Sequence, residues 1–244
     1  MKAVILAAGK GKRLMPLTRD IPKCMVNICG TPIIEWNVRA LERNGIKDII
    51  IVYGYKGNVI KDYFMNAKNC NINIEFIEQS SLTGTADAID LVKENIDDDF
   101  IVLAGDTIFF DQYIRKLFDK SNSLLYTWHY KDLEEYGTIE LEKDEETIIN
   151  IHEKHTNPVS EKVNISGYHF TPTIFDYIDK TPMNKGERPI TDTINEMIKD
   201  GYKFYGTEVK DWNHISYPYD VERIEDDFYR RIRYDKTNNF DNWV

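Results

Sequence analysis

Short apolar runs alternate with segments of helical length through the first half of the chain. The runs fall at residues 4–7, 49–53, 72–77 and 100–104 and are rich in β-branched side chains, as buried strands are. Parallel strands need a crossover of a dozen or more residues, which is the spacing found here. The pattern therefore predicts a doubly wound α/β sheet whose ligands bind beyond the carboxyl ends of the strands.

The segments between and after these runs refine the prediction. Thr31 is expected to cap the first helix, with Pro32 at its first position. After about residue 120 the strands become shorter, and we expect them to extend the sheet and to add antiparallel strands over the pocket. Helices are predicted at 32–44, 85–94, 112–120, 191–199 and 221–232, and the later strands at 124–130, 137–141, 148–152 and 163–170.

Composition excludes several classes of partner. The chain has 31 Lys and Arg against 41 Asp and Glu, so its net charge of −10 lacks the basic footprint of a nucleic-acid binder. No apolar run approaches the roughly 18 residues of a membrane-spanning helix, and the chain begins without a leader pattern. Cys24, Cys29 and Cys70 form no CxxC pair and are expected to be reduced thiols. We therefore expect a cytoplasmic protein that binds neither nucleic acid nor membrane.

A glycine-rich loop follows the first predicted strand and reads LAAGKGKRLMPLTRDIPKCM over residues 6–25. Small residues let backbone N–H groups approach a phosphate chain closely, and the loop's cations can neutralise it. The Walker A pattern GxxxxGK[ST] is absent, and Leu14 stands where the dinucleotide pattern GxGxxG has its last glycine. These residues predict a triphosphate cradle of another kind.

The complete string resembles the N-terminal signature of the sugar-1-phosphate nucleotidylyltransferases, the family of glucose-1-phosphate thymidylyltransferase and UTP-glucose-1-phosphate uridylyltransferase. The resemblance covers nearly the whole chain in the expected order, at Gln79 with 84–88, 103–106, 136–137, 153–154, 167–168, 190–192 and Trp212 with Ile215. It implies a Rossmann-like, glycosyltransferase-A-like mixed sheet with an antiparallel sugar-binding insertion. One domain over residues 1–244 is then expected, with a nucleotide-binding half at 1–120, a sugar-binding half at 121–234 and a tail at 235–244.

The reaction implied by the resemblance joins two anions. A sugar-phosphate oxygen attacks the α-phosphorus of a nucleoside triphosphate and expels pyrophosphate, so cations must hold the two reactants together. Arg13 suits the triphosphate because its planar fork can grip two oxygens, and Lys23 offers a point charge near the α-phosphate. Asp106 follows a buried strand and is expected to bind Mg²⁺, or Mn²⁺, while Lys154 would hold the sugar phosphate.

Two groups of binding residues are implied as well. Gln79 precedes Gly84 by five residues, which is the spacing of the family's pyrimidine-reading Gln, and its amide can both donate to and accept from uracil or thymine. One methyl group is worth only about 1 kcal/mol, so UTP and dTTP remain open. The nucleotide residues are Leu6, Ala8, Gly9, Gly11, Gln79, Gly84 and Thr85, and the sugar residues are Tyr136, Gly137, Glu153, Gly167 and Trp212.

The C-terminal motif departs from the family pattern. The family usually has Trp-x-Asp-Ile-Gly there, with the Asp as second metal ligand, and His214 occupies that position. Magnesium prefers oxygen, whereas imidazole suits zinc. His214 could bind a softer metal, an oxygen of Asp211 or Asn213 could replace it, or Asp106 and phosphates alone could hold the cation. We favour the second or third arrangement, because phosphate oxygens already supply much of a magnesium shell.

We therefore expect metal-dependent transfer of a nucleotidyl group from UTP or dTTP to a hexose 1-phosphate. Two alternatives remain: a CTP-dependent cytidylyltransferase acting on a non-sugar alcohol phosphate, and a catalytically silent nucleotide-sugar-binding regulatory subunit. Residues 215–220 resemble the archaeal-type branch, in which a left-handed β-helix often follows. Without hexapeptide repeats, this chain is expected to lack that domain and its acetyltransferase activity. Aromatic residues at Tyr229 and Trp243 would permit a homodimer.

Overall fold

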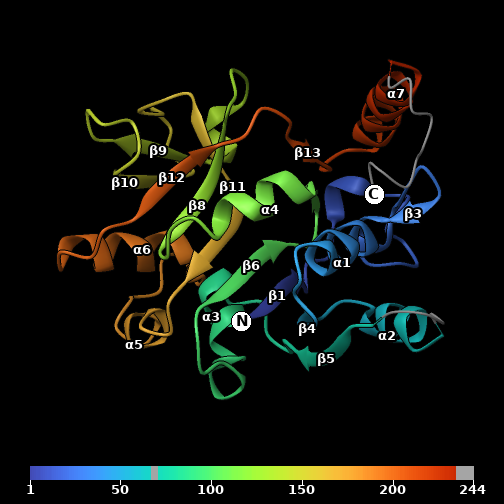
Figure 1. Cartoon of the computed structure of the whole chain (residues 1–244), viewed down its shortest axis with the longest axis horizontal. Coiled ribbons are helices and arrows are strands. Elements are labelled where there is room, and N and C mark those ends of the chain that lie inside the picture. Colours follow the sequence, from blue (N-terminus) through green and yellow to red (C-terminus); the bar gives the residue numbers. More distant parts are fainter. Residues whose placement is uncertain (67–70, 235–244) are drawn as a thin grey trace.

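The computed structural model describes residues 1–66 and 71–234 and contains one large mixed sheet (Figure 1). Cys70 and Trp243 lie outside the described residues, whereas Cys24 and Cys29 are free thiols, as expected. The sheet order is β10-β9-β11-β6-β1-β4-β5, with β8 on β11 and β12 on β8. Its strands are β1 (Lys2–Ala7), β4 (Asp48–Tyr53), β5 (Asn73–Glu78), β6 (Phe100–Ala104), β8 (Ser123–Trp128), β9 (Gly137–Leu141), β10 (Ile148–Glu153), β11 (Lys162–Phe170) and β12 (Tyr205–Glu208).

The parallel half of the sheet follows the apolar runs of the sequence. β1 lies between β4 and β6, and β5 is the edge strand beyond β4; all three pairings are parallel. Val4 pairs with Ile50 and Val102, and all three side chains are buried. The helices beside this half are α1 (Ile33–Arg43), α2 (Gly57–Asn66), α3 (Thr85–Asp90) and α4 (Asp111–Leu117). The predicted mixed α/β sheet is confirmed.

The predicted start of α1 was wrong, because a short strand precedes the helix. Thr31 and Pro32 form strand β3 (Thr31–Pro32), which pairs with β2 (Asn27–Ile28) in a short hairpin. This pairing keeps the chain extended as far as Pro32, so Pro32 occupies the cap position and no side chain caps the helix. The helix predicted at 85–94 is also divided, because α3 ends at Asp90 and a separate turn, η3 (Lys93–Asn95), follows.

A kink in β11 creates the opening that the site uses. Ser166 has a φ of +60°, and the pairing of β11 with β8 shifts register between Asn164 and Tyr168. The Ser166 N–H donates to Asn164 Oδ1 at 3.0 Å. Before the kink β11 pairs with β9 at Val163, and after it with β6 from Gly167 onward, both antiparallel. β6 and β9 therefore meet the same edge of β11 without continuing one another, and the expected antiparallel addition is confirmed.

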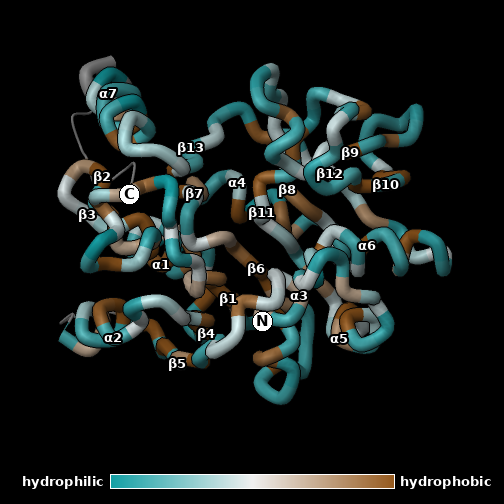
Figure 2. Tube along the Cα trace, turned by 180° about the vertical axis from the view of Figure 1, so that it is seen from behind, coloured by the Kyte–Doolittle hydropathy of each residue, from teal (hydrophilic) through white to brown (hydrophobic). Residues whose placement is uncertain are grey.

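Helices cover the sheet and one end of the molecule. Figure 2 shows hydrophobic residues concentrated in strands such as β1 and β6, with hydrophilic segments outside them. α5 (Ile174–Ile178) and α6 (Ile190–Lys199) contribute to the core that contains Phe100. α7 (Pro218–Tyr234) lies beside the β2–β3 hairpin, where Phe228 packs edge-on against Trp36 with ring centroids 5.2 Å apart. Within the described ranges, no helix combines the length and apolar character needed to cross a membrane.

Two isoleucines test the assignment of core and surface. Ile5 in β1 is fully buried, whereas Ile149 in β10 is 45% exposed. Removing buried methylene groups costs transfer energy and leaves a cavity, so Ile5→Ala should lower the free energy of unfolding by about 2–5 kcal/mol. Ile149→Ala should lower it by less than about 1 kcal/mol. Urea denaturation measures both, and equal losses would contradict the assignment.

Candidate active site

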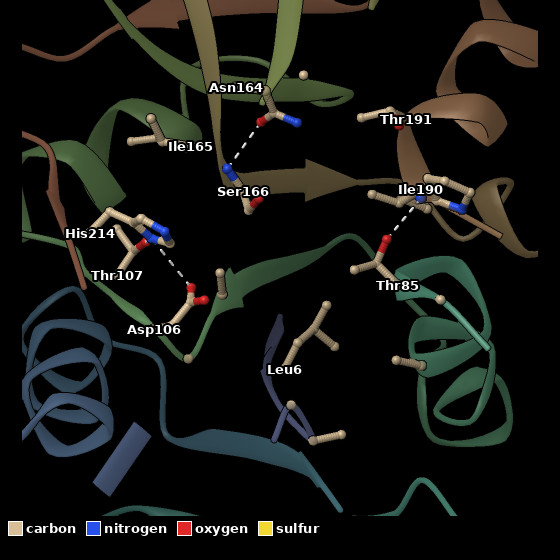
Figure 3. A pocket seen from close by; sticks show the side chains of 18 of the residues that line it. Leu6, Thr85, Asp106, Thr107, Asn164, Ile165, Ser166, Ile190, Thr191 and His214 are labelled. Atoms are coloured by element: carbon tan, nitrogen blue, oxygen red, sulfur yellow. Dashed lines mark hydrogen bonds and ion pairs between the residues drawn. The ribbon is translucent and has the colours of Figure 1, made fainter. Parts of the chain in front are cut away.

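A cavity of about 450 Å³ lies at the carboxyl ends of β1 and β6, beside the kink in β11 (Figure 3). Both halves of the chain contribute to its walls. All but two of the predicted site residues line it. They are Leu6, Ala8, Gly9, Arg13, Lys23, Gln79, Gly84, Thr85, Asp106, Tyr136, Gly137, Glu153, Lys154, Trp212 and His214.

Gly11 and Gly167 are the two predicted residues that do not line the cavity. Gly11 has a φ of +58°, and a Cβ there would lie 2.9 Å from Lys23 Cβ, so glycine lets Lys23 pack against the loop. A Cβ at Gly167 would lie 2.8 Å from Phe109 Cε1 and 3.0 Å from Leu125 Cδ1. Both glycines therefore permit close packing behind the cavity wall, and the structure does not place Gly167 in the sugar pocket.

A partly buried ion pair joins the glycine loop to the end of β6. Lys23 belongs to η2 (Lys23–Met25), and its Nζ lies 2.6 Å from Asp106 Oδ2. The Lys23 side chain is only 12% exposed, and that of Asp106 is 32% exposed toward the cavity. Burial alone would raise the pKa of Asp106, but Lys23 and the nearby His214 ring outweigh it and lower the pKa to about 2. Asp106 is therefore ionised at neutral pH.

Arg13 reaches the cavity from η1 (Lys12–Leu14), with partners from two other segments. Its guanidinium forms an ion pair with Glu135 of η4 (Leu133–Glu135) and donates from Nη2 to Ser216 Oγ at 3.1 Å. It also lies 5.3 Å from the centroid of the Tyr217 ring. Arg13 is half exposed, so an anion entering the cavity can compete with Glu135 for it.

His214 faces the same carboxylate as Lys23. It lies in β13 (Asn213–His214), which pairs with β7 (Thr107–Ile108) and places His214 opposite Thr107. Its Nδ1 is 3.1 Å from Thr107 Oγ1 and 3.7 Å from Asp106 Oδ1 (Figure 3). Its Nε2 is 2.8 Å from Ser216 Oγ. Burial lowers the pKa of His214 to about 4, although Asp106 acts in the opposite direction. The ring is therefore neutral at neutral pH.

Of the two arrangements favoured from the sequence, the one in which an oxygen of Asp211 or Asn213 replaces the second ligand finds no support in the geometry. Neither residue lines the cavity; both line a separate depression together with Lys210 and Arg223. Asp211 Oδ2 accepts a hydrogen bond from the Tyr113 hydroxyl at 2.8 Å. Successive side chains of a strand point to opposite faces, so the β13 pairing that turns His214 toward the cavity turns Asn213 away.

The Asp106 carboxylate is the predicted metal ligand of acidic type, and it lines the cavity. Across residues 1–66 and 71–234, no group of three or more His, Cys, Asp or Glu side chains is arranged to hold a metal ion. Magnesium is commonly held by one or two carboxylates, with water and substrate phosphates completing its shell. The ionised Asp106 carboxylate at the cavity wall suits such a site.

The nucleotide side of the cavity is built on a loop that glycine makes possible. The amide nitrogen of Gln79 donates to the Gly84 carbonyl at 3.2 Å, which uses one of its two donors. Gly84 has a φ of +121°, and a Cβ there would lie 2.3 Å from the Arg188 carbonyl oxygen. Thr85 Oγ1 accepts from the Ile190 N–H at 2.9 Å (Figure 3). The segment from the second half therefore supports the predicted base-binding loop.

The opposite wall carries the predicted sugar residues. Glu153 Oε2 accepts a hydrogen bond from the Thr191 hydroxyl at 3.0 Å, and burial raises the pKa of the Glu153 carboxyl despite the nearby Lys154. Lys154 has a φ of +43°, and its N–H donates to the Tyr136 carbonyl at 3.1 Å. The Tyr136 ring packs edge-on against Trp212 at 5.0 Å. These contacts fix the wall before any ligand binds.

Several residues at the site were missed by the sequence analysis. Thr107, Glu135, Ser166 and Thr191 line the cavity, and Ser216 contacts two of its residues. Thr107 and Ser216 lie within two positions of predicted ligands, which is a weak signal. Glu135 pairs with a residue 122 positions away, and no local pattern indicates such a contact.

Comparison with known proteins identifies the family. The family model described as nucleotidyl transferase matches residues 2–229. This chain belongs to the nucleotidyl transferase family. The bifunctional protein GlmU of Methanocaldococcus jannaschii is 37% identical over 226 residues, which cover 91% of this chain and 52% of that protein. This nucleotidyl transferase chain thus spans about half the length of that relative.

Two further similarities agree in class and fold. The UTP–glucose-1-phosphate uridylyltransferase AglF of Haloferax volcanii is 33% identical over 92% of this chain and 95% of its own length. A structure of UDP-glucose pyrophosphorylase complexed with UDP-glucose matches with a TM-score of 0.84 over 94% of this chain and 98% of its own, at 22% identity. The predicted enzyme class, a nucleotidyltransferase, and the predicted fold are confirmed.

The buried carboxyl of Glu153 predicts a pH-dependent stability. Because its pKa is higher in the folded chain than in the unfolded one, ionisation costs folding free energy as the pH rises through the folded value. Glu153→Gln should therefore raise the Tm at about pH 8, and the gain should shrink toward about pH 4, where both states are largely protonated. Thermal denaturation at the two pH values measures this. The exposed Glu161→Gln should show no such gain, and a Glu153→Gln variant destabilised only at high pH would contradict the argument.

Proposed function

We propose that this chain transfers a nucleotidyl group from UTP or dTTP to a hexose 1-phosphate in a metal-dependent reaction that releases pyrophosphate. The observation that carries the proposal is the Lys23–Asp106 pair, which shares one cavity with Arg13 on the nucleotide side and with Glu153 and Lys154 on the sugar side. The similarity to AglF, a UTP–glucose-1-phosphate uridylyltransferase, favours UTP over dTTP. A second candidate function is not needed to account for these residues.

Lys23 and Arg13 act on the triphosphate in this proposal. The ammonium of Lys23 has three donors and uses one on Asp106, so others can reach an α-phosphate oxygen. Arg13 gives up its ion pair with Glu135 and binds the phosphate instead, because its planar guanidinium can contact two phosphate oxygens at once. A divalent cation bound at Asp106 would supply charge withdrawal from the α-phosphate. These residues stabilise the charge that develops as the α-phosphorus is attacked.

The second half of the chain orients the nucleophile. Lys154 pairs with the phosphate of the sugar, and Glu153 accepts hydrogen bonds from sugar hydroxyls while Thr191 fixes its carboxylate. An oxygen of the sugar phosphate then bonds to the α-phosphorus as the bond to the bridging oxygen breaks, and pyrophosphate leaves. Holding both anions in one cavity converts an encounter between repelling charges into an oriented step.

A substrate panel tests the proposal. Purified protein is incubated with Mg²⁺, one of UTP, dTTP, CTP, ATP or GTP, and either a hexose 1-phosphate or phosphocholine, and released pyrophosphate is measured. We expect pyrophosphate with UTP or dTTP and a hexose 1-phosphate. Turnover of CTP with phosphocholine would instead establish a cytidylyltransferase, and tight binding without turnover in every metal would establish a regulatory subunit.

Replacing Lys23 should separate catalysis from folding. Lys23→Met removes a donor that acts on the developing charge, so kcat/KM should fall by about 10²–10³-fold. The exposed Lys47, next to the amino end of β4, provides a matched control, and Lys47→Met should change kcat/KM by less than about twofold. Steady-state kinetics with circular dichroism as a check on folding measures both. Equal rates for the two variants would contradict the role given to Lys23.

A further inference from the structure

A chain of hydrogen bonds runs from Arg13, the proposed phosphate-binding residue, to Thr107, which adjoins the proposed metal-binding carboxylate of Asp106. It runs from Arg13 Nη2 to Ser216 Oγ at 3.1 Å, from Ser216 Oγ to His214 Nε2 at 2.8 Å, and from His214 Nδ1 to Thr107 Oγ1 at 3.1 Å. Asp106 Oδ1 lies 3.7 Å from the same Nδ1. Ser216 is 3% exposed and Thr107 1%, so water has little access to the chain's inner members.

Arg13 fixes the direction in which these hydrogen bonds are donated. A guanidinium only donates, so Ser216 Oγ accepts from Arg13. The hydroxyl proton of Ser216 then points to His214 Nε2, which acts as the acceptor. In a neutral imidazole the other nitrogen carries the proton, so Nδ1–H donates toward Thr107 and Asp106.

The charges at the two ends of the chain disfavour the opposite tautomer. It would direct the Nδ1 lone pair toward the ionised Asp106 carboxylate, which is a repulsive arrangement. Either tautomer leaves one buried hydroxyl proton, that of Thr107 or that of Ser216, without a partner in this chain. The cationic Arg13 decides for Ser216, because it occupies an acceptor lone pair of Oγ and favours a hydroxyl proton directed away from it, toward the ring.

We propose that Ser216 is a positioning residue that fixes His214 as the Nδ1–H tautomer, so that the ring presents a proton rather than a lone pair to Asp106. Because it concerns the metal side of the site, this inference rests on the proposed function. His214 then supports the Asp106 carboxylate and supplies no nitrogen ligand. The cation meets a single protein carboxylate and an oxygen shell, which favours hard cations over zinc.

The first test reads the tautomer directly in protein free of metal and substrate. Protein labelled with ¹⁵N-histidine is studied by NMR, and the His214 signals are assigned by their loss in His214→Gln. We expect a protonated Nδ1 and an unprotonated Nε2 in the wild-type protein. Ser216→Ala should yield a mixture of tautomers, whereas Ser216→Thr, which keeps the hydroxyl, should preserve the wild-type state. The backbone N–H of Ser216 donates to Asp220 Oδ2 at 2.8 Å, so both variants keep this anchor of the segment.

The second test reads metal preference. Losing an outer-shell partner commonly changes metal affinity or activity by 10–100-fold, so the ratio of zinc- to magnesium-supported rates should rise about tenfold in Ser216→Ala and stay near wild type in Ser216→Thr. A wild-type Nε2–H tautomer, or a tautomer unchanged in Ser216→Ala, would overturn the inference. If the tautomer is as expected but no substrate is turned over, the hydrogen-bond assignment stands and the proposed function fails.

Discussion

The partly buried ion pair between Lys23 and Asp106 is the interaction on which the rest of the site depends. Removing two charges from water is expensive, and their attraction compensates only when geometry and further hydrogen bonds are good. Here the fold positions both Lys23 and Asp106. Gly11 lets Lys23 approach closely, and the carbonyl of Asp106 accepts the N–H of Ile215 at 3.1 Å, which fastens the Asp106 loop to the C-terminal segment. The fold therefore holds a cation and an anion at the edge of one cavity.

The two halves of the chain are joined at the cavity by specific contacts. Thr85 is held by Ile190, and the next residue, Thr191, holds the carboxylate of Glu153. Arg188, just before them, pairs with Asp87 at 2.7 Å. One short segment thus supports both the loop proposed to read the base and the wall proposed to bind the sugar. Small displacements of this segment should affect both ligands, because packed interiors transmit strain.

The parallel half of the fold could be predicted because its strands are local apolar runs, and three of them, β1, β4 and β6, are buried over most of their length. The site could be predicted because its motifs sit at strand ends, where an α/β sheet places ligands. Contacts between segments that lie far apart in the sequence could not be predicted. Thr31 was predicted as a cap but pairs as a strand residue in the β2–β3 hairpin, and the positive φ in β11 falls on Ser166 rather than on the adjacent Gly167.

The C-terminal motif of the site was likewise only partly predictable from the sequence. The sequence alone placed His214 at the position of the family's second metal ligand but did not identify its hydrogen-bond partners. The β7–β13 pairing is what turns Asn213 away and brings Ser216 to the ring. Whether an imidazole ligates a metal or supports its ligand depends on the hydrogen bond made by its second nitrogen, and that bond comes from the fold.

A crystal structure of the protein with Mg²⁺ and a non-hydrolysable UTP analogue tests the central claim most directly. The account predicts the α-phosphate within hydrogen-bond distance of Lys23, with the cation bound between that phosphate and Asp106. An analogue bound with its phosphates away from Lys23, Arg13 and Asp106 would contradict it.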